Sequence, residues 1–276
     1  MKKFSSILLL GLVALISSCG TEEKEWSYQE TVHLGEVRPI GLALTDEGFW
    51  ISDGDNNRLV QTDRNGKVAR YIDSLERPMH LDVAEGVVYV PQYGNDRIGV
   101  FAADILQQTQ GPGNLDAPAG VSVAGNTMAV ADFYNNQVHY KNEQGQWSTF
   151  GKKGSEPGEF LYPTDVQITE EGIWVADAYN HRAQLIDFEG QSLAVIGEEQ
   201  DLNAATGIWV TETEVFLTDF ENDRVWVFNK QGEVLQLLDE GVEKPTDMIS
   251  EGESLWVANF RKGELLKYAL TPVQKK

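Results

Sequence analysis

The sequence predicts an all-β protein, a six-bladed β-propeller of four-stranded antiparallel blades, closed by an N-terminal strand that pairs in the last blade. Three observations lead to this fold class. A block of about forty residues recurs six times, which is typical of propeller blades. Each copy contains short apolar strands and no helical periodicity. The sixth copy has only three strands, whereas a strand-like segment at residues 28–36 precedes the first copy.

The six copies begin at a proline or, once, at an alanine: Pro39, Pro78, Pro118, Pro163, Ala205 and Pro245. An inner strand follows this residue, and a second strand rich in aromatic residues and two outer strands come after it. Neighbouring blades cover both faces of each sheet, so the strands should be nearly continuous apolar runs, as they are. We expect the propeller to span residues 28–270, with 28–36 as the outer strand of the last blade and 271–276 as a C-terminal tail.

The N-terminus has the features of an export signal. Two lysines precede an apolar run at residues 7–16, and two serines precede Cys19. The apolar run is too short to span a bilayer as a helix. Its end resembles a bacterial lipobox, which implies a lipoprotein signal peptide at residues 1–18 and lipidation of Cys19. A free thiol beside an ordinary cleavage site is the alternative.

Residues 19–27 are expected to be the lipidated cysteine and a polar, acidic tether. An acidic stretch after the cysteine is similar to the surface-export signal of lipoproteins in Bacteroidetes-type bacteria, and a plain tether is the alternative. The expected location is the cell envelope. The lipid would anchor the chain to the outer membrane, on its periplasmic or its surface face.

Composition excludes several classes of protein. The chain has 276 residues and a formal net charge of −21, from 22 Lys and Arg against 43 Asp and Glu. We expect no nucleic-acid partner, because a phosphate-binding surface needs a clustered excess of Lys and Arg. A hydrophobic content of 41% excludes intrinsic disorder. The single cysteine excludes an internal disulfide, a CxxC redox pair and a thiolate zinc cluster.

Three segments of the repeat resemble the NHL-repeat family of six-bladed propellers: VADAYNHR (175–182), VADFYNNQ (130–137) and FGKKGSEPGEFLYPTDV (150–166). The resemblance covers about residues 28–270. The sixth copy departs from it, with Asn259, Lys262 and Glu264 at the positions of Asp, Asn and Arg. The resemblance implies the propeller fold and leaves the function open, since propellers carry many unrelated functions.

Polar residues recur at the end of the second strand of each blade. An Asp position holds Asp53, Gln92, Asp132, Asp177, Asp219 and Asn259; an Asn position holds Asn56, Asn95, Asn135, Asn180 and Asn222; an Arg position holds Arg58, Arg97, Arg182 and Arg224. Repetition in every blade indicates turn scaffolding, because a catalytic group is needed only once. We expect the Asp to accept turn amides, the Asn to adopt a left-handed conformation and the Arg to contact neighbouring blades.

The residue two positions after the start of each copy alternates between glycine and polar residues. Gly41, Gly120 and Gly207 occupy it in blades 1, 3 and 5, and His80, Asp165 and Asp247 occupy it in blades 2, 4 and 6. These polar residues are candidates for a calcium or zinc site or for polar groups at the mouth of the central channel. The alternatives are that Pro-Thr-Asp is only a common NHL strand start and that alternate blades are too far apart to share an ion.

Aromatic residues follow the Asp position where turn tips are usually polar. They are Tyr93, Phe133, Tyr134, Tyr179, Phe220 and Phe260, and the cations expected nearby are Arg38, Arg77, Lys244 and Arg261. Because the first and second strands are antiparallel, these loops and the strand starts should lie on one face of the disc. The sequence predicts an aromatic rim there for a sugar, peptide or protein ligand; rings folded inward between blades are the alternative.

We therefore expect a non-catalytic binding module, with no catalytic residue, no metal ligand and no cofactor assigned. The alternative is a metal-dependent lyase or a lactonase-like hydrolase with calcium or zinc in the central channel. The NHL-like amidating lyases have zinc-binding histidines directly after the blade prolines, and those positions here are Ile40, Met79, Ala119, Thr164, Thr206 and Thr246. The lactonase metal-site pattern cannot be located either, and GxSxG, HExxH and phosphate-loop motifs are absent from the sequence.

Overall fold

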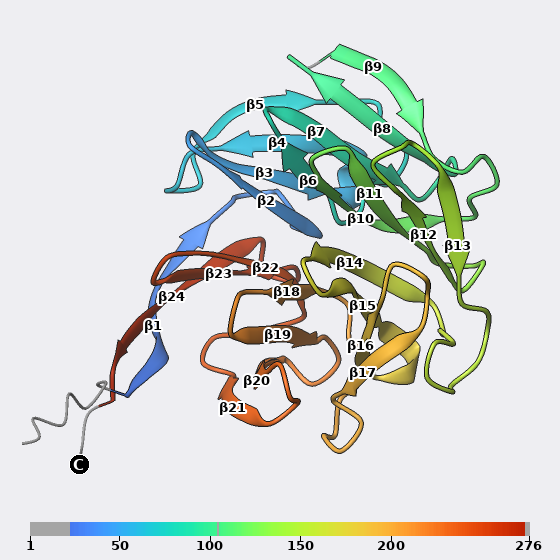
Figure 1. Cartoon of the computed structure of the whole chain (residues 1–276). Helices are drawn as coiled ribbons and strands as arrows, with labels where there is room; N and C mark the ends of the chain where they lie inside the picture. The colour runs from blue at the N-terminus through green and yellow to red at the C-terminus, as the bar shows by residue number, and fades with distance from the viewer. Residues whose placement is uncertain (1–22, 104, 274–276) are drawn as a thin grey trace, which may run out of the picture.

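The computed structural model describes residues 23–103 and 105–273, and it confirms six four-stranded antiparallel sheets around a central axis (Figure 1). The expected signal peptide at residues 1–18 and Cys19 lie outside the described residues. Within the described ranges, no helix has the length and apolar character needed to cross a membrane.

The strands of each blade follow one another from the axis outward. Blade 1 contains β2 (Gly41–Thr45), β3 (Gly48–Asp53), β4 (Arg58–Thr62) and β5 (Val68–Ile72). Blade 2 contains β6 (Asp82–Ala84), β7 (Val87–Gln92), β8 (Arg97–Ala102) and β9 (Ile105–Gln110). Blade 3 contains β10 (Pro118–Ala124), β11 (Thr127–Asp132), β12 (Gln137–Lys141) and β13 (Trp147–Phe150).

Blade 4 contains β14 (Pro163–Thr169), β15 (Gly172–Asp177), β16 (Arg182–Ile186) and β17 (Ser192–Ile196). Blade 5 contains β18 (Ile208–Val210), β19 (Glu214–Asp219), β20 (Arg224–Asn229) and β21 (Val234–Leu238). Blade 6 contains β22 (Pro245–Glu251), β23 (Ser254–Asn259), β24 (Glu264–Pro272) and β1 (Lys24–His33). Short 3-10 turns, η1 (Gly54–Asn56) and η2 (Ala178–Asn180), follow the second strands of blades 1 and 4.

The N-terminal strand closes the ring, as predicted. β1 pairs with β24 from Lys24 opposite Pro272 to His33 opposite Glu264. The strand begins at Lys24, inside the segment 19–27 expected to be a tether, and β24 includes Thr271 and Pro272, which were expected in the tail. Both strands are longer because Trp26 is buried. Its backbone amide donates to Gln236 Oε1 of β21 (2.8 Å), so the extension ties blade 6 to blade 5.

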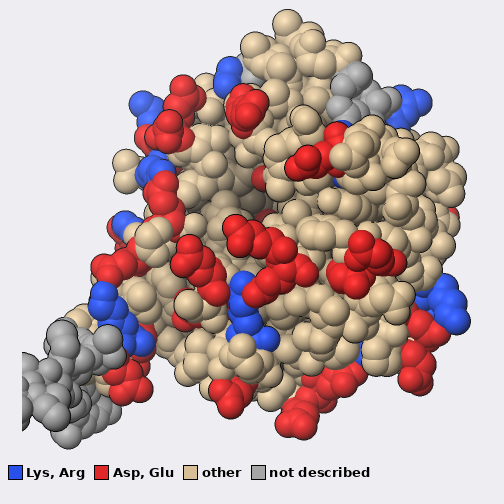
Figure 2. Space-filling model, viewed as in Figure 1, with Lys and Arg blue, Asp and Glu red and all other residues tan. Residues whose placement is uncertain are grey.

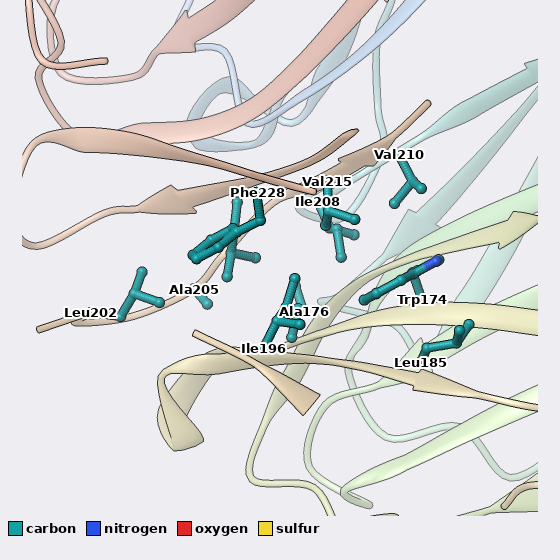
Figure 3. Close-up of a cluster of buried hydrophobic side chains, with 12 residues drawn as sticks. Trp174, Ala176, Leu185, Ile196, Leu202, Ala205, Ile208, Val210, Val215 and Phe228 are labelled. Atoms are coloured by element: carbon teal, nitrogen blue, oxygen red, sulfur yellow. The ribbon is translucent and has the colours of Figure 1, made fainter. Parts of the chain in front are cut away.

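Apolar clusters between neighbouring blades form the core. Trp174 of blade 4 belongs to the same buried cluster as Ile208, Val215 and Phe228 of blade 5 (Figure 3). The expected core position three residues before the Asp position is buried in five blades, at Trp50, Ala129, Trp174, Phe216 and Trp256. Burial of these faces between sheets explains why the strands are apolar on both sides.

The Asp position is turn scaffolding, as expected. In blade 4, Asp177 accepts the Leu161 amide (2.7 Å) with Oδ1. Its Oδ2 accepts the Asn180 side-chain amide (2.8 Å) and Arg182 Nε (3.0 Å). Blades 1 and 5 repeat this arrangement around Asp53 and Asp219.

Two details of the turn differ from expectation. In blades 1, 4 and 5 the Arg side chain pairs with the Asp of its own blade, because the Arg begins the third strand directly opposite that Asp. In blade 2 the residue opposite Arg97 is Gln92. The left-handed residue is the one after the Asn position: Asn57, Asp96, Asn136, His181 and Asp223. Its side chain accepts a backbone amide just before the next blade, as His181 Nδ1 does from Ala204 (3.0 Å), so the residue links successive blades.

We predict that Trp26→Ala lowers the free energy of unfolding by about 3–5 kcal/mol, the usual cost of deleting a buried tryptophan. The Trp26 ring contacts Phe216 edge-on at a centroid distance of 5.8 Å, so the variant leaves a cavity where the ring closes. Urea denaturation measures the loss. Leu235→Ala on β21 is the control, because Leu235 is 53% exposed and its truncation should change stability by less than about 0.5 kcal/mol. Equal loss of stability in Trp26→Ala and Leu235→Ala would contradict the role of Trp26 in closing the ring of blades.

Candidate functional site

The starts of the inner strands and the ends of the second strands lie on the same face of the disc. Pro118 pairs with Asp132 in blade 3, and Pro163 pairs with Asp177 in blade 4. We call this side the top face. The loops that follow the Asp position open onto it, which confirms the placement expected from the antiparallel pairing.

Five aromatic side chains from blades 2, 3 and 4 gather on the top face, and we call them the aromatic cluster. Phe133 stacks on Tyr162 with ring centroids 4.8 Å apart. Tyr93 contacts Phe133 at 5.7 Å, and Tyr179 contacts Tyr162 at 5.1 Å. Tyr134 contacts Tyr93, Phe133 and Tyr162 at 5.7, 5.1 and 6.1 Å. The rings thus form one continuous group rather than separate turn tips.

The aromatic cluster is partly open to solvent. Tyr134 and Tyr179 are 50% and 54% exposed, and the other three rings are half-buried beneath and beside them. With Arg77 and Met79, the five rings line a cavity of about 410 Å³. Neither alternative drawn from the sequence holds for the whole cluster: three rings are half-buried, and two are half-exposed on the surface.

Charge around the aromatic cluster is sparse. The Arg77 guanidinium lies 4.9 Å from the centroid of the Tyr93 ring, and Lys153 Nζ lies 6.0 Å from that of Tyr162. Burial, followed by its hydrogen bond to Tyr134, raises the pKa of the Tyr93 hydroxyl, so this phenol stays neutral at physiological pH. The cavity therefore offers ring faces, hydroxyls and one nearby guanidinium.

The other predicted rim residues lie apart from the cluster. Phe220 and Phe260 are half-buried, and among the described residues neither contacts a cluster ring. Lys244 Nζ lies 5.4 Å from the centroid of the Phe220 ring and forms an ion pair with Glu221 (2.9 Å). Arg38 is half-buried and Arg261 is exposed. The rim is thus concentrated on three blades instead of running around all six.

Sequence reasoning missed Tyr162. It occupies the position before the blade proline, where blades 2 and 6 have Arg77 and Lys244, and all three residues have positive φ. This backbone conformation is unusual before proline. Comparing the copies at that position would have found one aromatic residue among three cations and two alanines: Arg38, Arg77, Ala117, Tyr162, Ala204 and Lys244.

The three polar residues of alternate blades meet on the axis, and we call them the channel cluster. His80 Nδ1 lies 3.6 Å from Asp247 Oδ2 and 3.8 Å from Asp165 Oδ2, and the three residues are only 3–6% exposed. Alternate blades are therefore close enough to share an ion. Both distances are too long for a hydrogen bond, and Nδ1 has no hydrogen-bond partner among the described residues.

Backbone amides hold the two carboxylates in place. Asp165 accepts the Val166 amide with Oδ1 (2.9 Å) and the Ile208 amide of blade 5 with Oδ2 (3.0 Å). Asp247 accepts the Met248 amide with Oδ1 (2.8 Å) and the Leu42 amide of blade 1 with Oδ2 (2.7 Å). Each carboxylate thereby joins its own blade to the next.

Asp82 makes the corresponding link from blade 2 to blade 3, which sequence reasoning missed. Its carboxylate accepts the amides of Val83 and Val123, each at 2.7 Å. It lies two residues further along its strand because His80 occupies the position that holds Asp in blades 4 and 6. Alignment by the proline alone therefore concealed the third carboxylate.

The alternating glycines have a steric cause. A Cβ on Gly120 would lie 2.7 Å from Asp165 Cα, closer than real Cβ atoms come, and Gly41 and Gly207 meet the neighbouring backbone in the same way. The inner strands of blades 1 and 2, 3 and 4, and 5 and 6 approach this closely only because glycine is present.

The channel cluster is electrostatically strained. Burial raises the pKa of Asp165 to about 7, with the charge of Asp247 adding to the effect and His80 opposing it. Burial disfavours protonation of His80, but the carboxylates of Asp165 and Asp247 outweigh burial and raise its pKa. A proton or another cation among these three groups therefore stabilises them.

A cavity of about 280 Å³ lies along the inner strands, and Asp82, Asp165 and Asp247 line it. The hairpins that join the inner and second strands on the opposite face carry many acids: Asp46, Glu47, Glu85, Glu170, Glu171 and Glu212. Figure 2 shows a hollow in the middle of the molecule with Asp and Glu side chains around it. The channel is therefore an acidic environment that favours cations.

No protein-family model matches the chain, and no curated protein matches it in sequence. The chain is similar to a solved streptogramin B lyase, with 13% identity, 92% of this chain and 88% of that chain covered, and a TM-score of 0.67. It is similar to an inactive virginiamycin B lyase from Staphylococcus aureus with quinupristin, with 17% identity, coverage of 91% and 90%, and a TM-score of 0.65. The computationally designed Ika8 protein has 13% identity, coverage of 84% and 70%, and a TM-score of 0.56.

These likenesses show the fold alone. Two of the similar structures are lyases and one is a designed protein, so the same architecture accompanies different purposes. They confirm the six-bladed propeller, whereas the NHL family is not shown by them.

We predict that the free energy of unfolding of chelator-treated protein increases as the pH falls from 8 to 6. The channel cluster should contribute about 1–2 kcal/mol to this increase. Unfolded Asp and His have pKa values of about 3.9 and 6.5. The folded pKa values of Asp165 and His80 are raised, so the folded state binds more protons in this interval and the stability is lost as the pH rises through the folded pKa values. Urea denaturation at pH 6, 7 and 8 measures the slope.

Asp165→Asn should flatten that slope, because it removes one of the titrating groups. Glu143→Gln, at an exposed turn, is the control and should keep the slope of the unaltered protein. A slope of opposite sign, or one that Asp165→Asn leaves unchanged, would show that the channel cluster does not govern the pH dependence.

Proposed function

We propose that the protein is a lipid-anchored binding module of the cell envelope that captures a sugar, peptide or protein ligand on the aromatic cluster of its top face. The observation that carries this proposal is the pair of half-exposed rings, Tyr134 and Tyr179, on a base of three half-buried rings beside a 410 Å³ cavity. Aromatic side chains that only fill space between blades would not be half-exposed together.

The chemistry of the aromatic cluster suits a ligand with flat apolar faces. Tyrosine rings stack on the C–H faces of sugars and on proline or aromatic side chains, and their hydroxyls hydrogen-bond to polar edges. Arg77 next to the cavity adds a donor for a carboxylate, hydroxyl or carbonyl group. The rings support one another, so little side-chain freedom is lost on binding.

The first residues of the chain support the membrane anchor. Lipidation of Cys19 would leave four residues before β1 begins at Lys24, a span of at most about 18 Å. Blade 6 would then stay near the outer membrane, whether the protein faces the periplasm or the surface. [³H]Palmitate labelling, lost in Cys19→Ser, tests this part of the proposal.

We predict that replacing both Tyr134 and Tyr179 with alanine weakens ligand capture at least tenfold, because the two exposed rings have the position of binding hot spots. The probes are a glycan array, a proline-rich and aromatic peptide array, and immobilised envelope proteins. Titration calorimetry on the best probe gives the affinity. Tyr71→Ala is the matched control, since Tyr71 is 45% exposed on β5, outside the cluster.

The double variant should unfold at nearly the same temperature as the unaltered protein. A large loss of thermal stability would show that the two rings belong to the core. Equal capture by the double variant and the unaltered protein would contradict the proposed binding surface.

A metal-dependent lyase or lactonase-like hydrolase is the second candidate. It is favoured by the channel cluster, in which one imidazole and two carboxylates meet beside a 280 Å³ cavity. Quinupristin, bound in the Staphylococcus aureus lyase structure, and simple lactones are the substrates to test with Zn²⁺ or Ca²⁺. Turnover that His80→Ala abolishes would replace the binding module as the leading function.

A further inference from the structure

We infer that the channel cluster binds one divalent transition-metal cation of the Zn²⁺ class, held by His80, Asp165 and Asp247 from three alternate blades. The inference is separate from ligand capture on the top face, because it uses neither the rings nor the cavity of the aromatic cluster.

The unpartnered nitrogen of His80 is the first reason. The imidazole is 3% exposed, and Nδ1 has no hydrogen-bond partner among the described residues although it faces two carboxylate oxygens. A buried polar atom without a partner is costly, as are two carboxylates facing each other in a buried site. One cation would satisfy the imidazole and both carboxylates together.

The distances suit such a cation. The three ligand atoms lie within 4.8 Å of one another, and the two His80–Asp distances are 3.6 and 3.8 Å. Tetrahedral zinc with ligands at about 2.0–2.2 Å separates them by roughly 3.4 Å. The two His80–Asp distances exceed this value by only a few tenths of an ångström. The facing oxygens of Asp165 and Asp247 lie within 4.8 Å of each other and would have to approach by up to about 1.4 Å to bind the same ion. Two carboxylates balance the charge of a divalent ion. Calcium fits less well, because it prefers six to eight oxygen ligands.

Backbone amides hold the facing oxygens in place. The oxygen of Asp165 that faces His80 accepts the Ile208 amide, and that of Asp247 accepts the Leu42 amide. A carboxylate oxygen has a second lone pair, which remains for the cation. Hydrogen bonds of this kind orient metal ligands in proteins.

The channel provides access. Asp165 and Asp247 line the 280 Å³ cavity, and the acidic hairpins of the opposite face raise the local concentration of cations. Three protein ligands leave a further position that a water or a small ligand in the cavity can occupy.

A protonated His80 held between the two carboxylates is the competing arrangement, and metal titration separates the two. The full chain is treated with chelator, dialysed and titrated with ZnCl₂ at pH 7.5 by calorimetry. We expect one saturable site with micromolar or tighter affinity and an upward shift of the unfolding temperature. Where His80 was protonated, zinc binding should release a proton, which is measured by comparing titrations in two buffers.

His80→Ala should abolish the site and the shift in unfolding temperature. His80→Gln serves if the alanine variant does not fold, since it fills the space without the imidazole. His33→Ala is the control: His33 is exposed on β1 with Nδ1 3.1 Å from Glu264 Oε1, so it offers zinc an accessible histidine beside an acid outside the channel. The control variant should retain the site.

Three results would overturn the inference: no saturable zinc binding, zinc binding that survives His80→Ala, or saturable binding of Ca²⁺ with none of Zn²⁺. The variant lacking the Tyr134 and Tyr179 rings should bind zinc like the unaltered protein, so failure of the metal site and failure of the proposed binding surface are distinguishable.

Discussion

The inner strands of neighbouring blades approach each other so closely that each junction between blades needs a specific residue. At three junctions a Cβ would collide with the neighbouring backbone, and Gly41, Gly120 and Gly207 are present there. At the other three, the carboxylates of Asp82, Asp165 and Asp247 accept amides from both blades. The two kinds of junction alternate around the ring, and the width of the channel follows from them.

The channel cluster is a consequence of these junctions. Asp165 and Asp247 are held by amides of adjoining blades, so their positions are fixed by the architecture. His80 differs from them because only its backbone makes a junction: its amide and carbonyl pair with blade 3. Its imidazole is therefore available for a proton or a cation, although it is as deeply buried as the carboxylates.

The top face shows how an asymmetric surface arises on a repeated scaffold. Four blades have an aromatic residue directly after the Asp position: Tyr93, Phe133, Phe220 and Phe260. The rings gather over blades 2, 3 and 4, where Tyr162 contacts both Phe133 and Tyr179. In blade 6 the position of Tyr162 belongs to Lys244, which pairs with acids instead. Differences between the copies, rather than their common features, thus distinguish one part of the face.

The sequence by itself determined the number of blades, the four-stranded sheets, the closing N-terminal strand and the scaffolding role of the recurring Asp, because each depends on local pattern and repetition. It also identified His80, Asp165 and Asp247 as unlike their counterparts. Only the tertiary structure decided that these three meet within 4.8 Å, that Asp82 completes the set of junctions, and that Tyr162 joins the aromatic cluster. These facts depend on the distances between blades and on the directions of the side chains. Both are determined by the assembled ring of six blades and cannot be read from the sequence of one repeat.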